Sequence, residues 1–82
     1  MQVRVLFFGM LKDLAGRESE SLNLAEPATL EDVVRHYEER LPGLRGLLPA
    51  IALSINQEYA PRHSQLKPGD EIALLPPVSG GL

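Results

Sequence analysis

The first hydrophobic segment of the chain, residues 3–8, combines β-branched, aliphatic and aromatic side chains and stops at Gly9, which predicts a β-strand. Successive side chains of a strand point to opposite faces of the sheet. One face therefore carries Val3, Val5 and Phe7, and the other carries Arg4, Leu6 and Phe8. Because both faces present large apolar groups, we expect a central strand that is covered on both sides.

Residues 29–41 show the clearest helical pattern in the chain. Thr29 can cap the helix, and Asp32 lies in the first turn, where a carboxylate is favoured by the helix dipole. Pro42 and Gly43 then end the helix. Apolar residues at helical spacing predict one stripe that packs on the core, formed by Leu30, Val33, Val34, Tyr37 and Leu41.

Three further segments have the patterns of strands. Residues 51–55 alternate cleanly, and residues 71–75 are apolar on both faces, with Ile72 and Leu74 opposite Ala73 and Leu75. The polar residues 18–24 favour an edge strand, because charged side chains discourage pairing between sheet edges. Turns are expected at residues 56–58 and 67–70, where Asn, Pro, Gly and Asp gather.

The order of these elements predicts the α+β class, a single sheet with one main helix packed on one face. A short helical turn is expected at residues 10–15, with Gly16 as its left-handed C-terminal residue. We expect one domain over residues 1–77 and a flexible C-terminal tail over residues 78–82.

The composition excludes several classes of function. The 82 residues carry a net charge of −3 and scattered Lys and Arg, which disfavours nucleic acid and suits a basic protein partner. Without any cysteine, the chain has no disulfide, thiolate metal site or cysteine nucleophile. No segment has the roughly 20 apolar residues of a membrane helix, and the N-terminus does not resemble a signal peptide, so we expect a cytoplasmic protein.

The remaining polar residues give no catalytic or metal-binding pattern. His36 and His63 lack a second ligand at metal spacing, so we expect no metal site. Glu18 and Glu20 are predicted to lie on a solvated face, and Ser79 has no nearby histidine that would activate it as a nucleophile.

The C-terminal segment has the chemistry of a carrier. Pro76 and Pro77 end the last strand because neither can donate a hydrogen bond to a sheet. Val78, Ser79 and Gly80 are the expected tail-threading residues. Because Gly80 and Gly81 lack Cβ atoms, this stretch is thin enough to thread a narrow channel, and a Gly81 carboxylate would be sterically open. ATP could convert this carboxylate to an acyl adenylate, and sulfide or a persulfide could displace AMP to leave a thiocarboxylate, without any side chain from this protein.

Three segments of the chain resemble the small subunit of molybdopterin synthase, a ubiquitin-like sulfur carrier. They are Val5-Leu6-Phe7-Phe8-Gly9, Asn56-Gln57-Glu58-Tyr59, and the run from Gly69-Asp70-Glu71-Ile72-Ala73 into Pro76-Pro77-Val78-Ser79-Gly80-Gly81. The resemblance covers nearly the whole chain, and the C-terminal run is its most specific part. It implies the ubiquitin-like β-grasp fold, with a mixed sheet and one main helix packed on one face, in agreement with the predicted order of elements.

The resemblance also implies an activity. An ATP-dependent activating enzyme would adenylate Gly81 and convert it to a thiocarboxylate, with no cofactor bound to this chain. The tail would then enter the active site of the large synthase subunit and donate sulfur to cyclic pyranopterin monophosphate during molybdenum cofactor biosynthesis. Catalytic side chains would belong to the large subunit. The family docks through an apolar sheet surface, and the matching positions are Phe8, Tyr59 and Leu75. The alternative is that loops of the chain cover Phe8 and Leu75.

One departure concerns the last residue, because the family ends at the second glycine and here Leu82 follows Gly81. Three interpretations stay open: a peptidase removes a native Leu82, Leu82 was added in cloning, or it protects an inactive precursor. Two other functions also stay open. One is a related carrier for tRNA thiolation, cysteine or thiazole synthesis, and the other is a ubiquitin-like module that binds or tags proteins. Lysine conjugates would indicate a modifier, and a thiocarboxylate would indicate a sulfur carrier.

Overall fold

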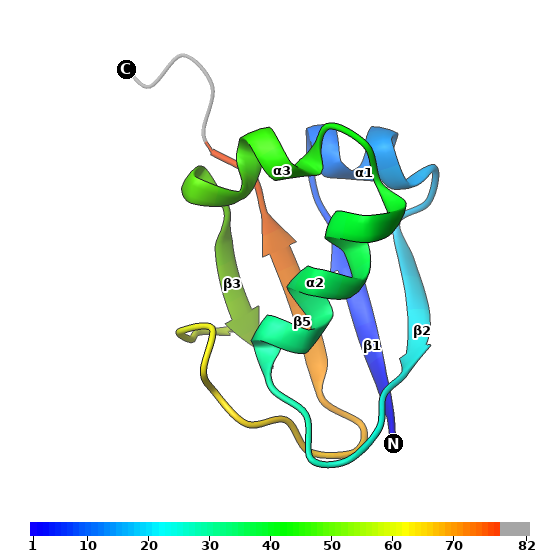
Figure 1. The fold of residues 1–82 in the computed structure, drawn as a ribbon, viewed down its shortest axis with the longest axis vertical. Coiled ribbons are helices and arrows are strands. Elements are labelled where there is room, and N and C mark those ends of the chain that lie inside the picture. The colour runs from blue at the N-terminus through cyan, green and yellow to red at the C-terminus, as the bar shows by residue number, and fades with distance from the viewer. Residues whose placement is uncertain (78–82) are drawn as a thin grey trace.

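The computed structural model describes residues 1–77 of the protein, and the expected tail, residues 78–82, lies outside the described residues. Five strands form one mixed sheet in the order β2-β1-β5-β3-β4 (Figure 1). The central pair, β1 and β5, is parallel, and the other pairs are antiparallel. The strands are β1 (Gln2–Phe7), β2 (Ser19–Asn23), β3 (Ala52–Ile55), β4 (Glu58–Tyr59) and β5 (Glu71–Leu75).

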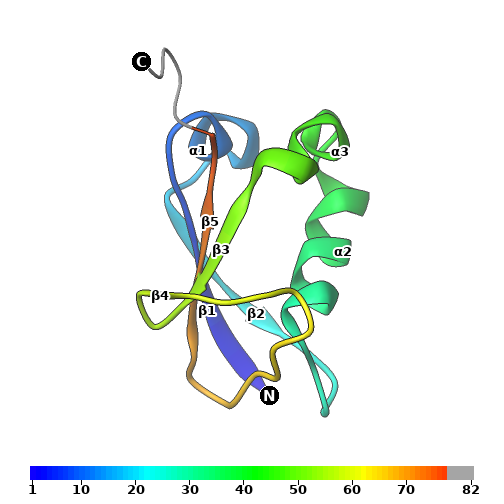
Figure 2. The same cartoon turned by 90° about the vertical axis from the view of Figure 1, so that its left-hand side faces the viewer.

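The main helix, α2 (Leu30–Arg40), covers one face of the sheet, and within residues 1–77 no helix lies over the centre of the opposite face (Figure 2). Two short helices, α1 (Met10–Ala15) and α3 (Leu44–Leu47), lie at the end of the sheet from which the C-terminus leaves, and the 3-10 turn η1 (Leu48–Ala50) follows α3 (Figures 1 and 2). The predicted α+β class, with one main helix on one face, is confirmed.

Local sequence signals account for the ends of the helices. The backbone N–H of Thr29 donates to Asp32 Oδ2 at 2.8 Å, which satisfies a donor at the start of α2. Gly16 ends α1 with φ of 75°, the left-handed conformation expected at that position. The helical stripe is buried as predicted, except that Leu41 is half-buried at the end of α2.

The alternation predicted for the central strands is also confirmed. Val5 and Ile72 pair across β1 and β5, and both are fully buried beneath α2. Phe7 lies on the same face and is 2% exposed, whereas Phe8, one residue later, is 44% exposed. The strand itself ends at Phe7, so Phe8 extends past the last ladder position rather than lying within the strand.

The two predicted turns are linked by a polar network. Asn56 has a positive φ of 51°, and its side chain donates to Asp70 Oδ1 at 3.1 Å and accepts the N–H of Glu71 at 3.0 Å. Asp70 also accepts the N–H of Lys67 at 2.8 Å, which closes the turn before β5. This network joins the β3–β4 turn to the start of β5, two segments that are 14 residues apart or more in the chain.

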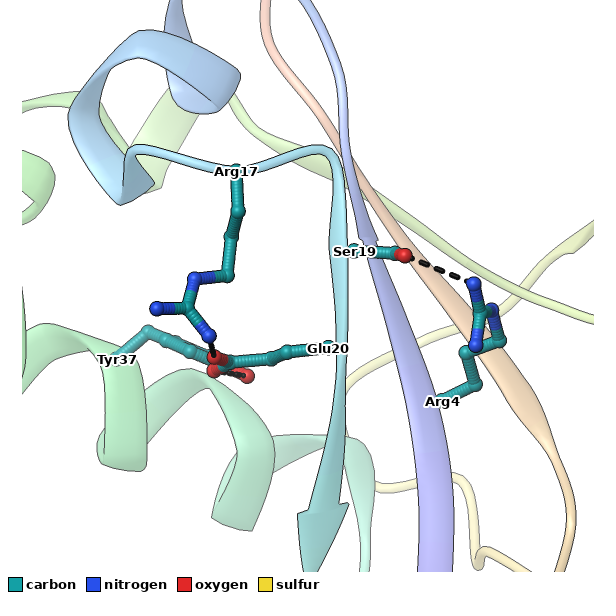
Figure 3. Close-up of polar contacts among 5 residues, drawn as sticks. All are labelled: Arg4, Arg17, Ser19, Glu20 and Tyr37. Carbon is teal, nitrogen blue, oxygen red and sulfur yellow. Dashed lines mark hydrogen bonds and ion pairs between the residues drawn. The ribbon is translucent and has the colours of Figure 1, made fainter.

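The prediction of a solvated Glu20 was wrong. Glu20 pairs with Val5 across β1 and β2, so it lies on the face that α2 covers. Its carboxylate accepts the Tyr37 hydroxyl and pairs with Arg17 at 3.0 Å (Figure 3). Burial first, and then the hydrogen bond to Glu20, raise the pKa of the Tyr37 hydroxyl well above its usual range. On the opposite face, Arg4 donates to Ser19 at 2.9 Å.

None of the helices in residues 1–77 combines the length and the apolar composition that a membrane-spanning segment requires.

Candidate functional site

The face of the sheet opposite α2 carries a hollow of about 300 Å³. Five apolar or aromatic side chains contribute to it, and we call them the sheet patch: Leu6, Phe8, Tyr59, Ala73 and Leu75. Three polar residues also line the hollow: Ser54, Gln57 and Glu71. The face is therefore a mainly apolar depression that also presents polar groups, a composition that occurs in protein-docking surfaces.

The pairing of the strands places the side chains of the sheet patch next to one another on one face of the sheet. Leu6 on β1 pairs with Ala73 on β5, and Ala73 pairs in turn with Ser54 on β3. Tyr59 on β4 pairs with Ser54 from the other side, so the same face continues across four strands. The tight turn at Asn56 and Gln57, both with positive φ, folds β4 back and presents the Tyr59 ring.

The structure places the three predicted docking residues around one hollow. Phe8 is 44% exposed and Tyr59 is 81% exposed, while Leu75 is half-buried between its neighbours. The alternative that loops of the chain cover Phe8 and Leu75 is therefore wrong for Phe8. Their contact with a partner stays a prediction.

Leu6 and Ala73 were not among the predicted docking residues, although they form part of the hollow. The signal for them was the same alternation, since Leu6 precedes Phe8 by two positions and Ala73 precedes Leu75 by two. Alternation along one strand does not identify the neighbouring strand. That Leu6 and Ala73 lie side by side therefore follows only from the order of strands in the sheet.

The last described residues lie against the start of α1, and we call this contact the tail root. Gly9 has φ of 55°, and a Cβ placed on it would lie 2.9 Å from Pro76 Cγ. A contact so short leaves no room for a side chain, so Gly9 allows the Pro76 ring to lie directly on the backbone. The end of β5 is thereby held beside the first turn of α1, next to the sheet patch.

Four residues of the predicted site lie outside the described residues. They are Gly81, which is predicted to carry the reactive carboxylate, and the tail-threading residues Val78, Ser79 and Gly80. Chain geometry still limits their reach. The four residues from 78 to 81 span at most about 14 Å at 3.3–3.6 Å each. Any active site that receives Gly81 must therefore lie within that distance of Pro77.

The described residues form no group of side chains that could hold a metal ion. Among residues 1–77, no group of three His, Cys, Asp or Glu side chains could hold a metal ion. His36 is half-buried beside Tyr37 on α2, and burial is the main cause of its lowered pKa. Both residues lie on the helical side of the sheet, away from the sheet patch.

A mixed sheet whose C-terminal strand lies parallel to the first strand, with one long helix across one face, defines the ubiquitin-like β-grasp class. The chain belongs to the ThiS family, whose model matches residues 5–81 and thus nearly the whole sequence. A relative from Chlamydomonas reinhardtii, named molybdopterin synthase sulfur carrier subunit, is 35% identical over 99% of this chain and 100% of its own length. The resemblance to this type of subunit is confirmed.

Solved structures agree in fold and length. The chain is similar, at 33% identity and a TM-score of 0.70, to a protein in a complex of subunits 1 and 2 of molybdopterin-converting factor from Helicobacter pylori, covering 99% of this chain and 100% of that one. It is also similar to SAMP1 from Haloferax volcanii, with a TM-score of 0.87 and 27% identity over 99% of this chain and all of the other. The β-grasp fold predicted from the sequence is confirmed.

Proposed function

We propose that this chain is the sulfur-carrying small subunit of a molybdopterin synthase, and that Gly81 carries the sulfur. The observation that carries the proposal is full-length similarity to molybdopterin synthase sulfur carrier subunits, in which the family match extends through Gly81. The sheet patch and the tail root support it, because they combine an apolar docking surface with the point from which the C-terminal segment departs.

The proposed chemistry proceeds in two steps at the Gly81 carboxyl group. A carboxylate oxygen attacks the α-phosphate of ATP in an activating enzyme, which releases pyrophosphate and forms an acyl adenylate. Sulfide then attacks the acyl carbon, and AMP leaves with the electron pair of the broken carbon–oxygen bond. The resulting thiocarboxylate needs no side chain from this protein, which is consistent with a chain that contains no cysteine.

The large synthase subunit is the proposed acceptor of the loaded tail. In that subunit the thiocarboxylate sulfur would attack a carbon of cyclic pyranopterin monophosphate and displace an oxygen leaving group from it. Water would then cleave the acyl carbon–sulfur bond, which leaves the sulfur on the pterin and returns Gly81 to a carboxylate. The role of this chain is that of a cosubstrate, with the catalytic side chains on the large subunit. The related Helicobacter pylori protein in complex with a second subunit supports a stable docked assembly. We propose the cytoplasm as the site of these reactions.

Intact-protein mass spectrometry tests the proposal. A chain that ends at Gly81 is incubated with ATP, sulfide and the activating enzyme, and its mass should rise by the difference between sulfur and oxygen. The chain with Leu82 is the matched control, because an amide bond at Gly81 blocks adenylation until Leu82 is removed. If the chain that ends at Gly81 is never adenylated or thiolated, the proposal is wrong.

A second candidate is a protein modifier, which the similarity to SAMP1 and to the small archaeal modifier protein 1 structures favours. In that role the Gly81 adenylate would be attacked by a lysine amine to form an isopeptide bond. An affinity-tagged chain expressed in cells distinguishes the two functions. Lysine conjugates on other proteins would indicate the modifier, whereas a free thiocarboxylate without conjugates would indicate the sulfur carrier.

A further inference from the structure

A second group of apolar side chains is exposed on the other side of the tail root. Met10 and Leu14 on α1 are 49% and 40% exposed, and Leu47 on α3 is half-buried beside them. These side chains line a hollow between α1 and α3, together with Asp13 and Gly43. We call Met10, Leu14 and Leu47 the end patch, because it lies at the end of the domain from which the C-terminus leaves (Figures 1 and 2).

The end patch and the sheet patch meet at the tail root. Phe8 belongs to the sheet patch, Met10 belongs to the end patch, and Gly9 between them lies against Pro76. Adjacent Cα atoms are 3.8 Å apart, and four helical residues rise about 6 Å, so Leu14 lies within about 10 Å of Gly9. Three of the four large hydrophobic side chains that are exposed among residues 1–77, Phe8, Met10 and Leu14, therefore lie around the point where the tail begins.

The size of a protein interface indicates what covers the end patch. A stable interface buries about 800 Å² on each partner, which corresponds to a disc with a radius of about 16 Å. A partner that takes Gly81 into its active site must place the mouth of that site within about 14 Å of Pro77. An interface of this size around the tail root therefore extends past Gly9 onto α1 and α3.

We propose that the large synthase subunit docks on both patches, with an apolar rim of its tail-receiving channel seated between α1 and α3. This inference rests on the proposed function, since it takes the large subunit as the tail-receiving partner. The end patch supplies contacts that the sheet patch alone does not, and it holds the partner over the end of the domain, so that the short tail reaches the active site.

Binding of the purified large subunit to variants of the full chain, measured by isothermal titration calorimetry, tests the inference. Met10→Glu and Leu14→Lys introduce opposite charges at the end patch and should each raise Kd at least about tenfold. Ala25→Glu and Ala25→Lys are the matched controls, because Ala25 is exposed in the β2–α2 loop at the opposite end of the domain and should leave Kd unchanged. Circular dichroism melting should show the fold of all four variants intact.

Phe8→Glu on the sheet patch separates this inference from the proposed function. If Phe8→Glu weakens binding while both end-patch variants bind like the wild type, the end patch is not part of the interface, and the inference is overturned although the proposed function stands. If the unaltered chain does not bind the large subunit at all, the proposed function fails and the inference fails with it. If an end-patch variant binds the large subunit like the wild type but binds the activating enzyme more weakly, the assignment of the end patch to the large subunit is also wrong.

Discussion

Tyr37 makes a hydrogen bond that connects α2 directly to β2, and its removal gives a well-defined test of the fold (Figure 3). The substitution Tyr37→Phe deletes only the hydroxyl group. The ring keeps its edge-to-face contact with Phe7, at 5.1 Å between centroids and 88° between planes, so the packing of the core is retained. Glu20 keeps its ion pair with Arg17 at 3.0 Å.

The expected loss follows from the partners of the bond. A hydrogen bond to a charged group contributes about 1.5–3 kcal/mol to stability. Because the Glu20 side chain is 25% exposed and retains Arg17, water and the guanidinium partly replace the lost donor. We therefore expect Tyr37→Phe to lower the free energy of unfolding by about 1–2 kcal/mol, which corresponds to a decrease in Tm of roughly 4–15 °C for a domain of this size.

Urea denaturation followed by circular dichroism measures this loss, and a double-mutant cycle with Glu20→Gln isolates the pair. The coupling energy should be at least about 0.5 kcal/mol, as found for residues in direct contact. Arg17→Gln is a useful control, since its guanidinium is largely exposed and its loss should cost less. The reasoning is refuted if the free energy of unfolding of Tyr37→Phe lies within about 0.3 kcal/mol of the wild-type value, or if the coupling energy is near zero. The threshold of about 0.3 kcal/mol is the usual error of additivity.

The same bond has a pH signature. Burial and Glu20 raise the pKa of Tyr37 above its usual value, so the folded state holds this proton at a pH where the unfolded state, with a pKa near 10, releases it. Stability from this group is therefore fully present below about pH 10 and is lost as the pH rises further. Tyr37→Phe should show a shallower loss of stability than the wild type between about pH 9 and 11 in urea titrations.

Four other predictions follow from named residues. Phe8→Glu should weaken docking with little loss of Tm because Phe8 is 44% exposed, whereas Phe7→Glu should unfold the domain; unfolding by Phe8→Glu would show that this side chain is core. Deletion of Gly81 should abolish sulfur transfer in a reconstituted synthase assay without any change in Tm, and a deletion variant that still supported cofactor synthesis would contradict the carrier role. Burial lowers the pKa of His36, so stability should fall as the pH drops through about 6.5, and His36→Asn should flatten that slope in urea titrations; equal slopes would argue against it. Asn56→Ala should cost about 1–3 kcal/mol of unfolding free energy because it removes two hydrogen bonds at a positive φ, and Asn56→Gly should cost less if the backbone conformation contributes.

Several features of the site could be predicted because they depend on residues close together in the chain. The opposite faces of Phe7 and Phe8 follow from alternation, and the exposed fractions of 2% and 44% confirm it. The left-handed Gly16 and the Asn56 turn follow from the conformational freedom of Gly and Asn. The short strand at Glu58–Tyr59 was missed as a strand, because two residues carry no measurable period.

Other features depend on contacts that no local pattern encodes. Glu20 was expected to be solvated because its neighbours in the sequence are polar, yet pairing with β1 places it beneath α2 and within reach of Tyr37, 17 residues later. The end patch has the same origin. Met10 and Leu14 lie on one short helix and Leu47 lies on another, and only the folded chain places them around one hollow.

The sequence by itself determined the class of fold, the two faces of the central strands, the helix and its cap, and the chemistry that a terminal Gly-Gly permits. Each of these depends on backbone conformation or side-chain period over a few residues. The tertiary structure alone decided the parallel pairing of β1 with β5, the seating of Pro76 on Gly9, and the position of two apolar patches beside the tail root. These features require strand order and long-range packing, which are selected by burial of the whole core rather than by any one segment.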